Sequence, residues 1–139
     1  MAIRKNATGV GSKAAKLTRQ RKVILQVIKE LKDHPTAAEI FEQAKVLLPT
    51  ISYATVYNSL RYLKSVDLIG EVTLAKGLSR YESDTSRHDH AFCTRCGKLV
   101  DIQLPETIKL MRAAARRTQF KPETIYLTLF GLCPECCTD

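Results

Sequence analysis

The first half of the chain carries apolar residues at helical spacing. From Thr18 onward, the apolar positions that fall on one face of a predicted helix are Val23, Ile24, Val27, Ile28 and Leu31. The sequence Asp33-His34-Pro35 interrupts this pattern, because the residue before a proline disfavours the helical conformation. We therefore expect the first helix to end at these residues.

Two further helices are predicted from their N-terminal caps. Thr36-Ala37-Ala38-Glu39 is a capping box, in which the threonine hydroxyl accepts from the third amide and the glutamate reaches back to the first. The expected apolar stripe behind it is Ile40, Phe41, Ala44, Leu47 and Leu48, and Pro49 ends the helix. Ser52 can cap the third helix, whose inward positions are Val56, Leu60 and Leu63.

A β-hairpin is predicted after the third helix. Its first strand carries Leu68, Val72 and Leu74, its turn is the sequence AKG, and its return strand covers residues 80–83. Three short helices followed by a hairpin are typical of a winged-helix domain, whose third helix enters the major groove of DNA. A small helical bundle with an attached hairpin is the alternative that the pattern leaves open.

The pattern changes after Asp84. We expect short strands at residues 88–93 and 98–104, a helix that opens at Pro105-Glu106, and a β-rich run at residues 124–132. The apolar positions of this helix are Ile108, Leu110, Met111, Ala114 and Ala115. The sequence thus predicts an α+β protein with a winged helix-turn-helix domain at residues 1–83, including a basic arm at residues 1–16, and an α/β domain at residues 84–139.

The formal net charge of +8 is concentrated at the amino end, where residues 1–22 hold seven Lys and Arg and no acid. Such a segment indicates a polyanionic partner, nucleic acid or anionic membrane, with a solvated tail as the alternative. No apolar run approaches the ~18 residues of a membrane span, and residues 1–16 lack the apolar core of a secretory signal. We expect a cytoplasmic protein with no membrane partner, in a reducing environment where paired cysteines more often bind metal than form disulfides.

Four of the five cysteines form two Cys-x-x-Cys pairs, Cys93 with Cys96 and Cys133 with Cys136. Each pair places two thiolates on a tight turn, spaced for metal–sulfur bonds of ~2.3 Å. Two pairs make a closed four-sulfur site, which favours structural Zn²⁺ and leaves no position for a substrate. Disulfides, a redox pair and an iron–sulfur site are the alternatives. Cys137 is left over, as a spare thiol or a competing ligand.

The histidines predict a second metal site, because four sulfurs already complete the zinc shell. His88 and His90 alternate along a strand, so their rings point the same way, whereas Asp89 points to the opposite face. Other candidate ligands are His34, Glu82, Asp84 and Asp101. Nitrogen and oxygen ligands suit Fe²⁺, Mn²⁺ or Zn²⁺, and two histidines with one carboxylate also occur in non-haem iron oxygenases. A zinc-stabilised interaction module is a third possibility.

The third helix carries side chains suited to DNA contacts. Its outward positions include Tyr53, Thr55, Asn58, Ser59, Arg61 and Tyr62, with Tyr57 at the edge of the buried stripe. Tyr and Asn can contact base edges or methyl groups, and Thr, Ser and Arg can bind phosphate. Tyrosine on a helix is also a common part of the core, so the combination with a basic arm carries more weight than any single residue.

In order and spacing, five motifs resemble the ferric uptake regulator (Fur) superfamily of bacterial metal-dependent repressors. They are HPTAAEIFEQ, ISYATVYNSLRYL, RYES, HDHAFCTRCGKLVDI and the final CPEC, within residues 17–136. The resemblance implies a homodimer that binds double-stranded promoter DNA, with the carboxyl-terminal domain as the dimerisation and metal-binding domain. The implied ligands of a structural zinc are Cys93, Cys96, Cys133 and Cys136. Those implied for a regulatory Fe²⁺ or Mn²⁺ are His34, Glu82, His88, His90 and Asp101.

The resemblance also suggests how the chain contacts DNA. Tyr57 and Asn58 match base-contacting positions of the family. Basic residues near the first helix, namely Lys16, Arg19 and Arg21, are expected to hold phosphates or the minor groove. Several neutralised phosphates imply an affinity that falls steeply with salt.

Within this superfamily, Asp101 favours the peroxide-sensing branch (PerR), since iron-uptake repressors tend to carry Glu there. Glu82 favours the iron-uptake branch. Arg87 and Ile125 stand where that branch often carries a further metal-binding group; since neither can bind a metal, their presence favours the peroxide branch. The peroxide branch implies that peroxide oxidises His34 or His88 and ends repression, whereas Mn²⁺ supports DNA binding without this reaction. We expect a regulator, not an enzyme, with peroxide as its signal and no other small-molecule substrate; an iron-responsive uptake repressor is the alternative.

Overall fold

The computed structural model describes residues 17–138. The basic arm at residues 1–16, including Lys16, lies outside the described residues. The chain divides into two compact units. One, here the amino-terminal unit, ends at Thr85, and the other, the carboxyl-terminal unit, begins at Ser86 and holds the rest of the chain.

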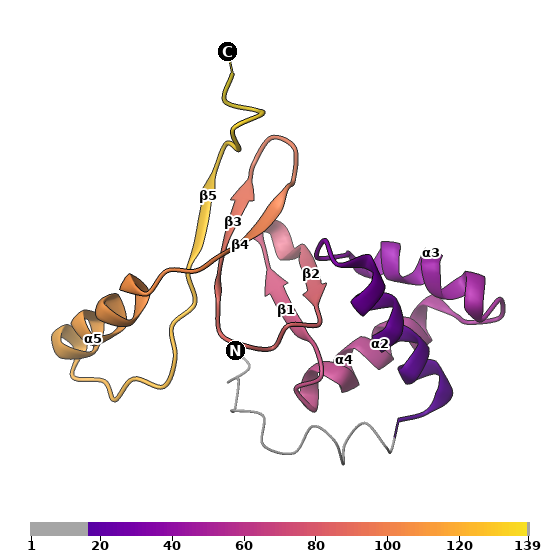
Figure 1. Cartoon of the computed structure of the whole chain (residues 1–139). Coiled ribbons are helices and arrows are strands. Elements are labelled where there is room, and N and C mark those ends of the chain that lie inside the picture. Colours follow the sequence, from indigo (N-terminus) through magenta and orange to yellow (C-terminus); the bar gives the residue numbers. More distant parts are fainter. Residues whose placement is uncertain (1–16, 139) are drawn as a thin grey trace. The chain divides into compact units, whose positions relative to one another are not determined.

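Three helices form the body of the amino-terminal unit (Figure 1). They are α2 (Arg19–Leu31), α3 (Ala37–Leu47) and α4 (Tyr53–Ser65). Each begins where a hydroxyl side chain accepts from a backbone amide of the first turn: Thr18, Thr36 and Ser52 respectively. The capping box predicted at Thr36 is present, since its hydroxyl accepts from Glu39 N while the Glu39 carboxylate accepts from Thr36 N.

One apolar core joins these helices. Its fully buried side chains, all at or below 1% exposure, include Ile24, Val27, Ile28, Ile40, Val56, Leu60 and Leu63. The pattern predicted these positions from their 3.6-residue spacing. Leu47 was also expected on the buried stripe, but it is the last residue of α3 and is 45% exposed.

A hairpin follows α4 and completes a winged helix. Strands β1 (Gly70–Thr73) and β2 (Ser79–Glu82) pair antiparallel, with Val72 opposite Arg80. The predicted turn at AKG is a short 3₁₀ segment (Ala75–Gly77), in which Lys76 takes a φ of 63°. Tyr81 is buried in the helical core, so it attaches the wing to the three helices.

A three-stranded sheet forms the centre of the carboxyl-terminal unit, with strand order β4-β3-β5 (Figure 1). The strands are β3 (Asp89–Cys93), β4 (Leu99–Ile102) and β5 (Thr128–Gly131). β3 pairs antiparallel with β4 and parallel with β5. Only the second half of the predicted run at residues 124–132 is therefore strand, because only that part pairs with β3.

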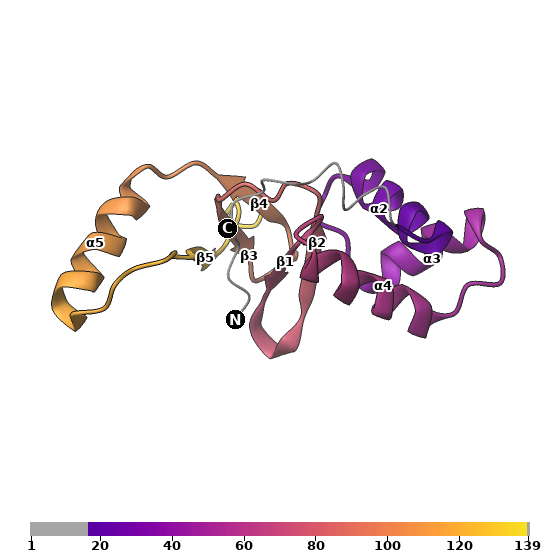
Figure 2. The same ribbon diagram turned by 90° about the horizontal axis from the view of Figure 1, so that it is seen from below.

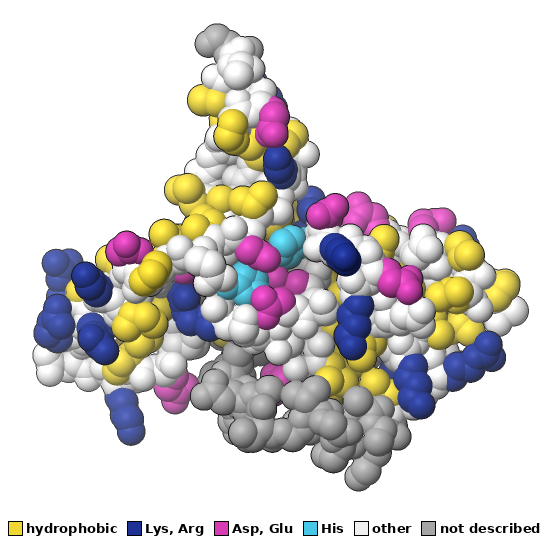
Figure 3. All heavy atoms as spheres, in the orientation of Figure 1, with side chains coloured by type: hydrophobic (Ala, Val, Ile, Leu, Met, Phe, Trp, Pro, Cys, Tyr) yellow, Lys and Arg dark blue, Asp and Glu magenta, His cyan; other side chains and the backbone are white. Residues whose placement is uncertain are grey.

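Helix α5 (Glu106–Thr118) lies between β4 and β5 in sequence and stands apart from the sheet (Figures 1 and 2). Thr107 is its buried residue, while its apolar Ile108 and Leu110 are 38% and 52% exposed. Lys and Arg side chains gather around this helix, with hydrophobic side chains beside them (Figure 3). Within the described residues, no helix combines the length and apolar character that crossing a membrane requires.

Candidate metal centres and nucleic-acid interface

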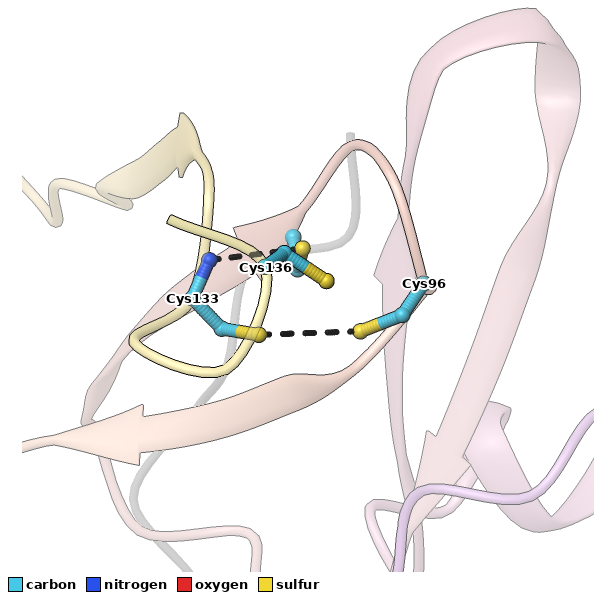
Figure 4. A group of neighbouring side chains, drawn as sticks. Cys96, Cys133 and Cys136 are labelled. Carbon is cyan, nitrogen blue, oxygen red and sulfur yellow. Dashed lines mark hydrogen bonds between the residues drawn. The ribbon is translucent and has the colours of Figure 1, made fainter. Parts of the chain in front are cut away.

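The two Cys-x-x-Cys turns meet in the carboxyl-terminal unit. Cys93 is the last residue of β3, and Cys96 lies in the turn that follows, where Gly97 takes a φ of 78°. The second pair follows β5, and since β5 lies beside β3, the two turns are adjacent. The side chains of Cys96, Cys133 and Cys136 point toward one another (Figure 4).

The spacing of the sulfur atoms fits a tetrahedral metal ion. One Sγ from each of the four cysteines lies within 4.8 Å of the others, and Cys96 Sγ is 3.8 Å from Cys133 Sγ. A tetrahedron with metal–sulfur bonds of ~2.3 Å has edges of about 3.8 Å. These four residues therefore form a structural zinc site, with no position left for a substrate. Cys137 is exposed and outside this set.

Hydrogen bonds prepare one of these sulfurs for metal binding. Cys133 N donates to Cys93 Sγ at 3.3 Å. Backbone N–H groups of Cys96 and Cys133 lower the pKa of Cys93 to about 6, so this residue is a thiolate at neutral pH. The pKa of Cys136 is raised to about 12, first because it shares a hydrogen bond with Cys133 and then because of burial. Metal binding must displace a proton from Cys136.

Polar side chains also connect the two turns. Arg95 Nη1 donates to Cys136 O at 2.6 Å, and Lys98 Nζ lies 3.1 Å from Glu135 Oε1. Each contact joins the first turn to the second. Both cations lie close to a cluster that carries two net negative charges once zinc is bound to four thiolates.

The second group of candidate ligands in the carboxyl-terminal unit is His88, His90 and Asp101. β3 and β4 place His90 opposite Asp101. The Nε2 atoms of both histidines lie 3.2 Å from the same carboxylate oxygen, Asp101 Oδ1, and their ring centroids are 4.5 Å apart. Two imidazoles and a carboxylate that converge in this way are a donor set suited to a divalent transition metal.

One of these histidines is held in the tautomer that a metal requires. His88 Nδ1 lies 2.8 Å from Ser86 O, and because a carbonyl oxygen only accepts, Nδ1 must carry the proton. In the neutral ring, Nε2 then presents its lone pair toward Asp101. A hydrogen bond from the other ring nitrogen to a carbonyl is the usual outer contact of a metal-binding histidine.

The amino-terminal unit holds the other two predicted ligands, His34 and Glu82. His34 Nε2 lies 3.2 Å from Glu82 Oε2. His34 takes a φ of 51°, an uncommon conformation for a residue other than glycine. Strand β2 fixes this loop, because Arg80 Nη1 donates to His34 O at 3.3 Å and Tyr81 N donates to Pro35 O at 2.9 Å. The same strand ends with Glu82, so it positions both ligands.

The predicted strand at residues 88–93 begins one residue later, at Asp89, so His88 directly precedes β3. Asp89, the residue between the two histidines, belongs to a different network. Asp89 is fully buried and accepts from Arg87 Nη2 at 2.7 Å and from Thr107 Oγ1 at 2.8 Å. Burial raises the pKa of Asp89, but the hydrogen bonds from Arg87 and Thr107 outweigh it, so the pKa lies below its ordinary value. Arg87 Nε also donates to Ile125 O at 3.2 Å. Arg87 therefore joins the start of this unit to the segment before β5.

Helix α4 presents most of the predicted DNA-contacting side chains to solvent. Tyr53, Tyr57, Asn58 and Arg61 are exposed and Thr55 is partly exposed. Tyr53 and Tyr57 lie side by side, with ring centroids 6.2 Å apart. Ser59 was predicted to face outward, but it is 5% exposed, because it lies beside Leu60 on the face of α4 that packs against α2 and α3. Its hydroxyl is therefore not a phosphate contact.

Of the predicted basic contacts on the first helix, Arg19 and Arg21 fall within the described residues. Arg19 is exposed. The guanidinium carbon of Arg21 lies 3.5 Å from the centroid of the Tyr62 ring, so this side chain bridges α2 and α4 through a cation–π contact.

The chain matches the model of the Ferric uptake regulator family over residues 12–130. The peroxide-responsive repressor PerR of Staphylococcus aureus (strain USA300) is 36% identical over 121 residues, which are 87% of this chain and 82% of the relative. The ferric uptake regulator of Francisella tularensis, in a structure with iron, has a TM-score of 0.77 at 25% identity, covering 87% of this chain and 93% of that one. The Helicobacter pylori ferric uptake regulator shares the fold, with a TM-score of 0.78 at 24% identity, covering 94% and 87%.

The chain therefore belongs to the ferric uptake regulator family, a family of transcriptional regulators. The resemblance stated from the sequence motifs is confirmed. So is the fold class, an α+β chain with an amino-terminal winged helix and a zinc site in the α/β part.

Sequence reasoning missed the role of Thr107. Its signal was a small polar residue in the first turn of an amphipathic helix, a position that is usually solvated. Asp89 was expected to point away from the histidines, but no sequence pattern indicates its partner, which lies eighteen residues further along the chain.

Proposed function

We propose that this protein is a metal-dependent repressor that binds promoter DNA as a homodimer and is released when peroxide oxidises its regulatory metal site. The convergence of His88, His90 and Asp101 on one point is the observation that carries this proposal. His34 and Glu82 complete the ligand set in our proposal, so that one Fe²⁺ or Mn²⁺ ion joins the two units. The pair is supported by its own 3.2 Å approach in a loop fixed by β2.

The homodimer is supported by the exposed apolar side chains of the carboxyl-terminal unit. Leu129 and Phe130 of the edge strand β5 are 60% and 48% exposed, and Phe120 beyond α5 is 77% exposed. Large apolar side chains exposed in this way favour a site of protein association. We propose that a second copy covers it, so that two α4 helices can reach successive major grooves.

For DNA recognition, we propose that Tyr57 and Asn58 contact base edges and that Tyr53, Thr55 and Arg61 contact the backbone nearby. Their exposure on α4 supports this assignment. Lys16, Arg19 and Arg21 are proposed to hold phosphates or the minor groove. Changing Asn58 to Ala should then reduce discrimination between operator and random DNA, whereas Arg19→Ala should weaken binding to both alike.

Peroxide sensing is supported by the similarity to a peroxide-responsive repressor and by Asp101. Bound Fe²⁺ would activate the peroxide, and in the net reaction the two electrons that reduce it come from the imidazole. The net change adds one oxygen atom to the imidazole of His34 or His88 and converts the peroxide to water. An oxidised ring is a poorer ligand, so the ion no longer joins the ligands of the two units and the repressor leaves DNA. A differential affinity of a few kcal/mol between closed and open forms suffices for this switch.

An iron-responsive uptake repressor is the second candidate, and Glu82 is the observation that favours it. One experiment separates the two. The zinc-loaded protein with Fe²⁺ is exposed to low micromolar peroxide, its peptides are weighed, and DNA binding is measured. We expect one added oxygen on the peptide of His34 or His88 and loss of DNA binding, and no change in the Mn²⁺ form. Unmodified histidines with DNA binding retained would exclude peroxide sensing.

A matched variant sharpens this comparison. Asp101→Glu keeps a carboxylate at the site but replaces the residue that favours the peroxide branch. We expect the variant to bind DNA in a metal-dependent way while its histidines are oxidised more slowly. Equal oxidation rates in the variant and the natural chain would remove Asp101 as support for peroxide sensing.

A further inference from the structure

The fully buried carboxylate of Asp89 lies between His88 and His90 in the chain. Asp89 has no exposed surface, and both of its oxygens accept hydrogen bonds. Oδ1 accepts from Arg87 Nη2 at 2.7 Å, and Oδ2 accepts from Thr107 Oγ1 at 2.8 Å and from Arg87 Nη1 at 3.3 Å. A forked guanidinium–carboxylate pair with an added hydroxyl fixes the carboxylate in both position and plane.

This network connects three separate segments of the carboxyl-terminal unit. Asp89 begins β3, Thr107 is the buried residue of α5, and Arg87 Nε holds Ile125 O in the segment that leads into β5. Beside it, His90 N donates to Leu127 O at 3.2 Å. The strand that carries the histidines is therefore tied to α5 and to the approach to β5 through one buried charge.

The hydrogen bonds of Asp89 restrain the positions of both neighbouring histidines. His88 directly precedes β3 and His90 lies within it; both rings approach Asp101, whereas the Asp89 carboxylate between them binds Arg87 and Thr107. Rotation or displacement of the strand at Asp89 would move both imidazoles relative to Asp101 on β4, where each Nε2 now lies 3.2 Å from the same oxygen. Fixing the position of Asp89 thus fixes the positions of both imidazoles relative to Asp101.

Arg87 supplies the positive charge that a buried carboxylate needs. An unpaired buried carboxylate is strongly destabilising, and it would attract a cation or a proton. Because the guanidinium of Arg87 already pairs with the Asp89 carboxylate, this network needs no bound ion. The histidine strand is consequently held in place whether or not the regulatory ion is bound.

We propose that Asp89 is a positioning residue, which together with Arg87 and Thr107 holds His88 and His90 ready for the regulatory ion. This inference rests on the regulatory site of the proposed function. It assigns to α5 a role in metal affinity, although α5 supplies no ligand.

The test removes the hydroxyl and keeps the shape, in the full-length, zinc-loaded protein. Thr107→Val is compared with Thr107→Ser, which retains the hydroxyl, and with Thr118→Val, which removes an exposed hydroxyl from the same helix. Mn²⁺ affinity is measured by competition with a chelating dye. The visible spectrum of Co²⁺ at the same site reports the geometry of its ligands.

We expect Thr107→Val to bind Mn²⁺ about tenfold more weakly and to change the Co²⁺ spectrum, with zinc content unaltered. Thr107→Ser and Thr118→Val should resemble the natural chain. Arg87→Gln should show the same weakening, partly restored in Arg87→Lys, which provides a second route if Thr107→Val loses zinc.

Unchanged Mn²⁺ affinity and Co²⁺ spectrum in both Thr107→Val and Arg87→Gln would overturn the positioning role. Failure of the natural chain to bind any ion besides zinc would instead overturn the proposed function. The two failures are therefore distinguishable within one set of titrations.

Discussion

Replacing Cys96 with Ser removes one thiolate from the zinc site. We expect the carboxyl-terminal unit of this variant to unfold while the amino-terminal unit stays folded. Among the described residues of that unit, the buried apolar side chains are Cys93 and Leu99. Burial of a large apolar side chain stabilises by about 1.5–3 kcal/mol, whereas a structural zinc contributes about 10–16 kcal/mol in small peptides at neutral pH. Zinc therefore dominates the stability of this unit.

The amino-terminal unit has a different basis for its stability. Its core of helical side chains, such as Ile24, Ile28 and Leu60, is almost completely shielded from solvent and includes no cysteine. The loss of zinc should leave this core intact. The variant should thus separate into a folded part before Thr85 and an unfolded part after Ser86.

Amide hydrogen exchange, followed by mass spectrometry of peptides, measures both units in one sample. We expect rapid exchange in peptides from residues 86–138 of Cys96→Ser, with retained protection in α2, α3 and α4, and loss of bound zinc. Cys137→Ser is the matched control, because Cys137 is exposed and outside the four-sulfur set; it should keep its zinc and its protection. Retained protection of β3 and β5 in zinc-free Cys96→Ser would refute this reasoning.

Three further predictions concern local interactions. In the wing, burial raises the pKa of Glu71, but hydrogen bonds from Lys64 and Ser79 lower it by more, so the pKa in the folded protein lies below its ordinary value. The stability that Glu71 contributes is therefore present above pH ~4.3 and is lost as the pH falls through the pKa of the folded state. The difference in urea midpoint between Glu71→Gln and the natural chain should therefore shrink from pH 7 to pH 3, and a constant difference would contradict the pairing. Thr36→Ala removes the capping box and should lower the free energy of unfolding of the amino-terminal unit by about 1 kcal/mol, measured by urea titration. Leu60→Ala should lower it by about 2–5 kcal/mol in the same assay, because Leu60 is 1% exposed, and an effect below that of Thr36→Ala would contradict its place in the core.

The sequence predicted best what is determined locally. Thr36 and Ser52 announce helix starts because a cap acts within one turn, and the four-sulfur site follows from two tight turns of fixed spacing. The core of the three helices follows from periodicity, since Val56, Leu60 and Leu63 fall on one face whatever they pack against.

What the sequence could not predict depends on contacts between distant segments. Ser59 is buried because α4 packs against two helices, which no property of a serine indicates. The exposed apolar side chains of α5 contradict the usual meaning of an amphipathic pattern, because none of the strands described in its own unit covers them. The hydrogen bond from Thr107 to Asp89 requires the first turn of α5 to lie beside the start of β3, and periodicity carries no information on that placement.

The most direct test of the account is the affinity of the zinc-loaded protein for DNA with and without the regulatory ion. A fluorescently labelled operator, selected from random DNA with the Mn²⁺ form, is titrated by anisotropy at fixed salt. The account predicts that removal of Mn²⁺ with a mild chelator weakens binding by about 5–150-fold, the usual range for coupling between two sites, and that His88→Ala binds weakly with or without Mn²⁺. Equal affinity of the Mn²⁺ form and the chelated form, each with its zinc retained, would contradict it.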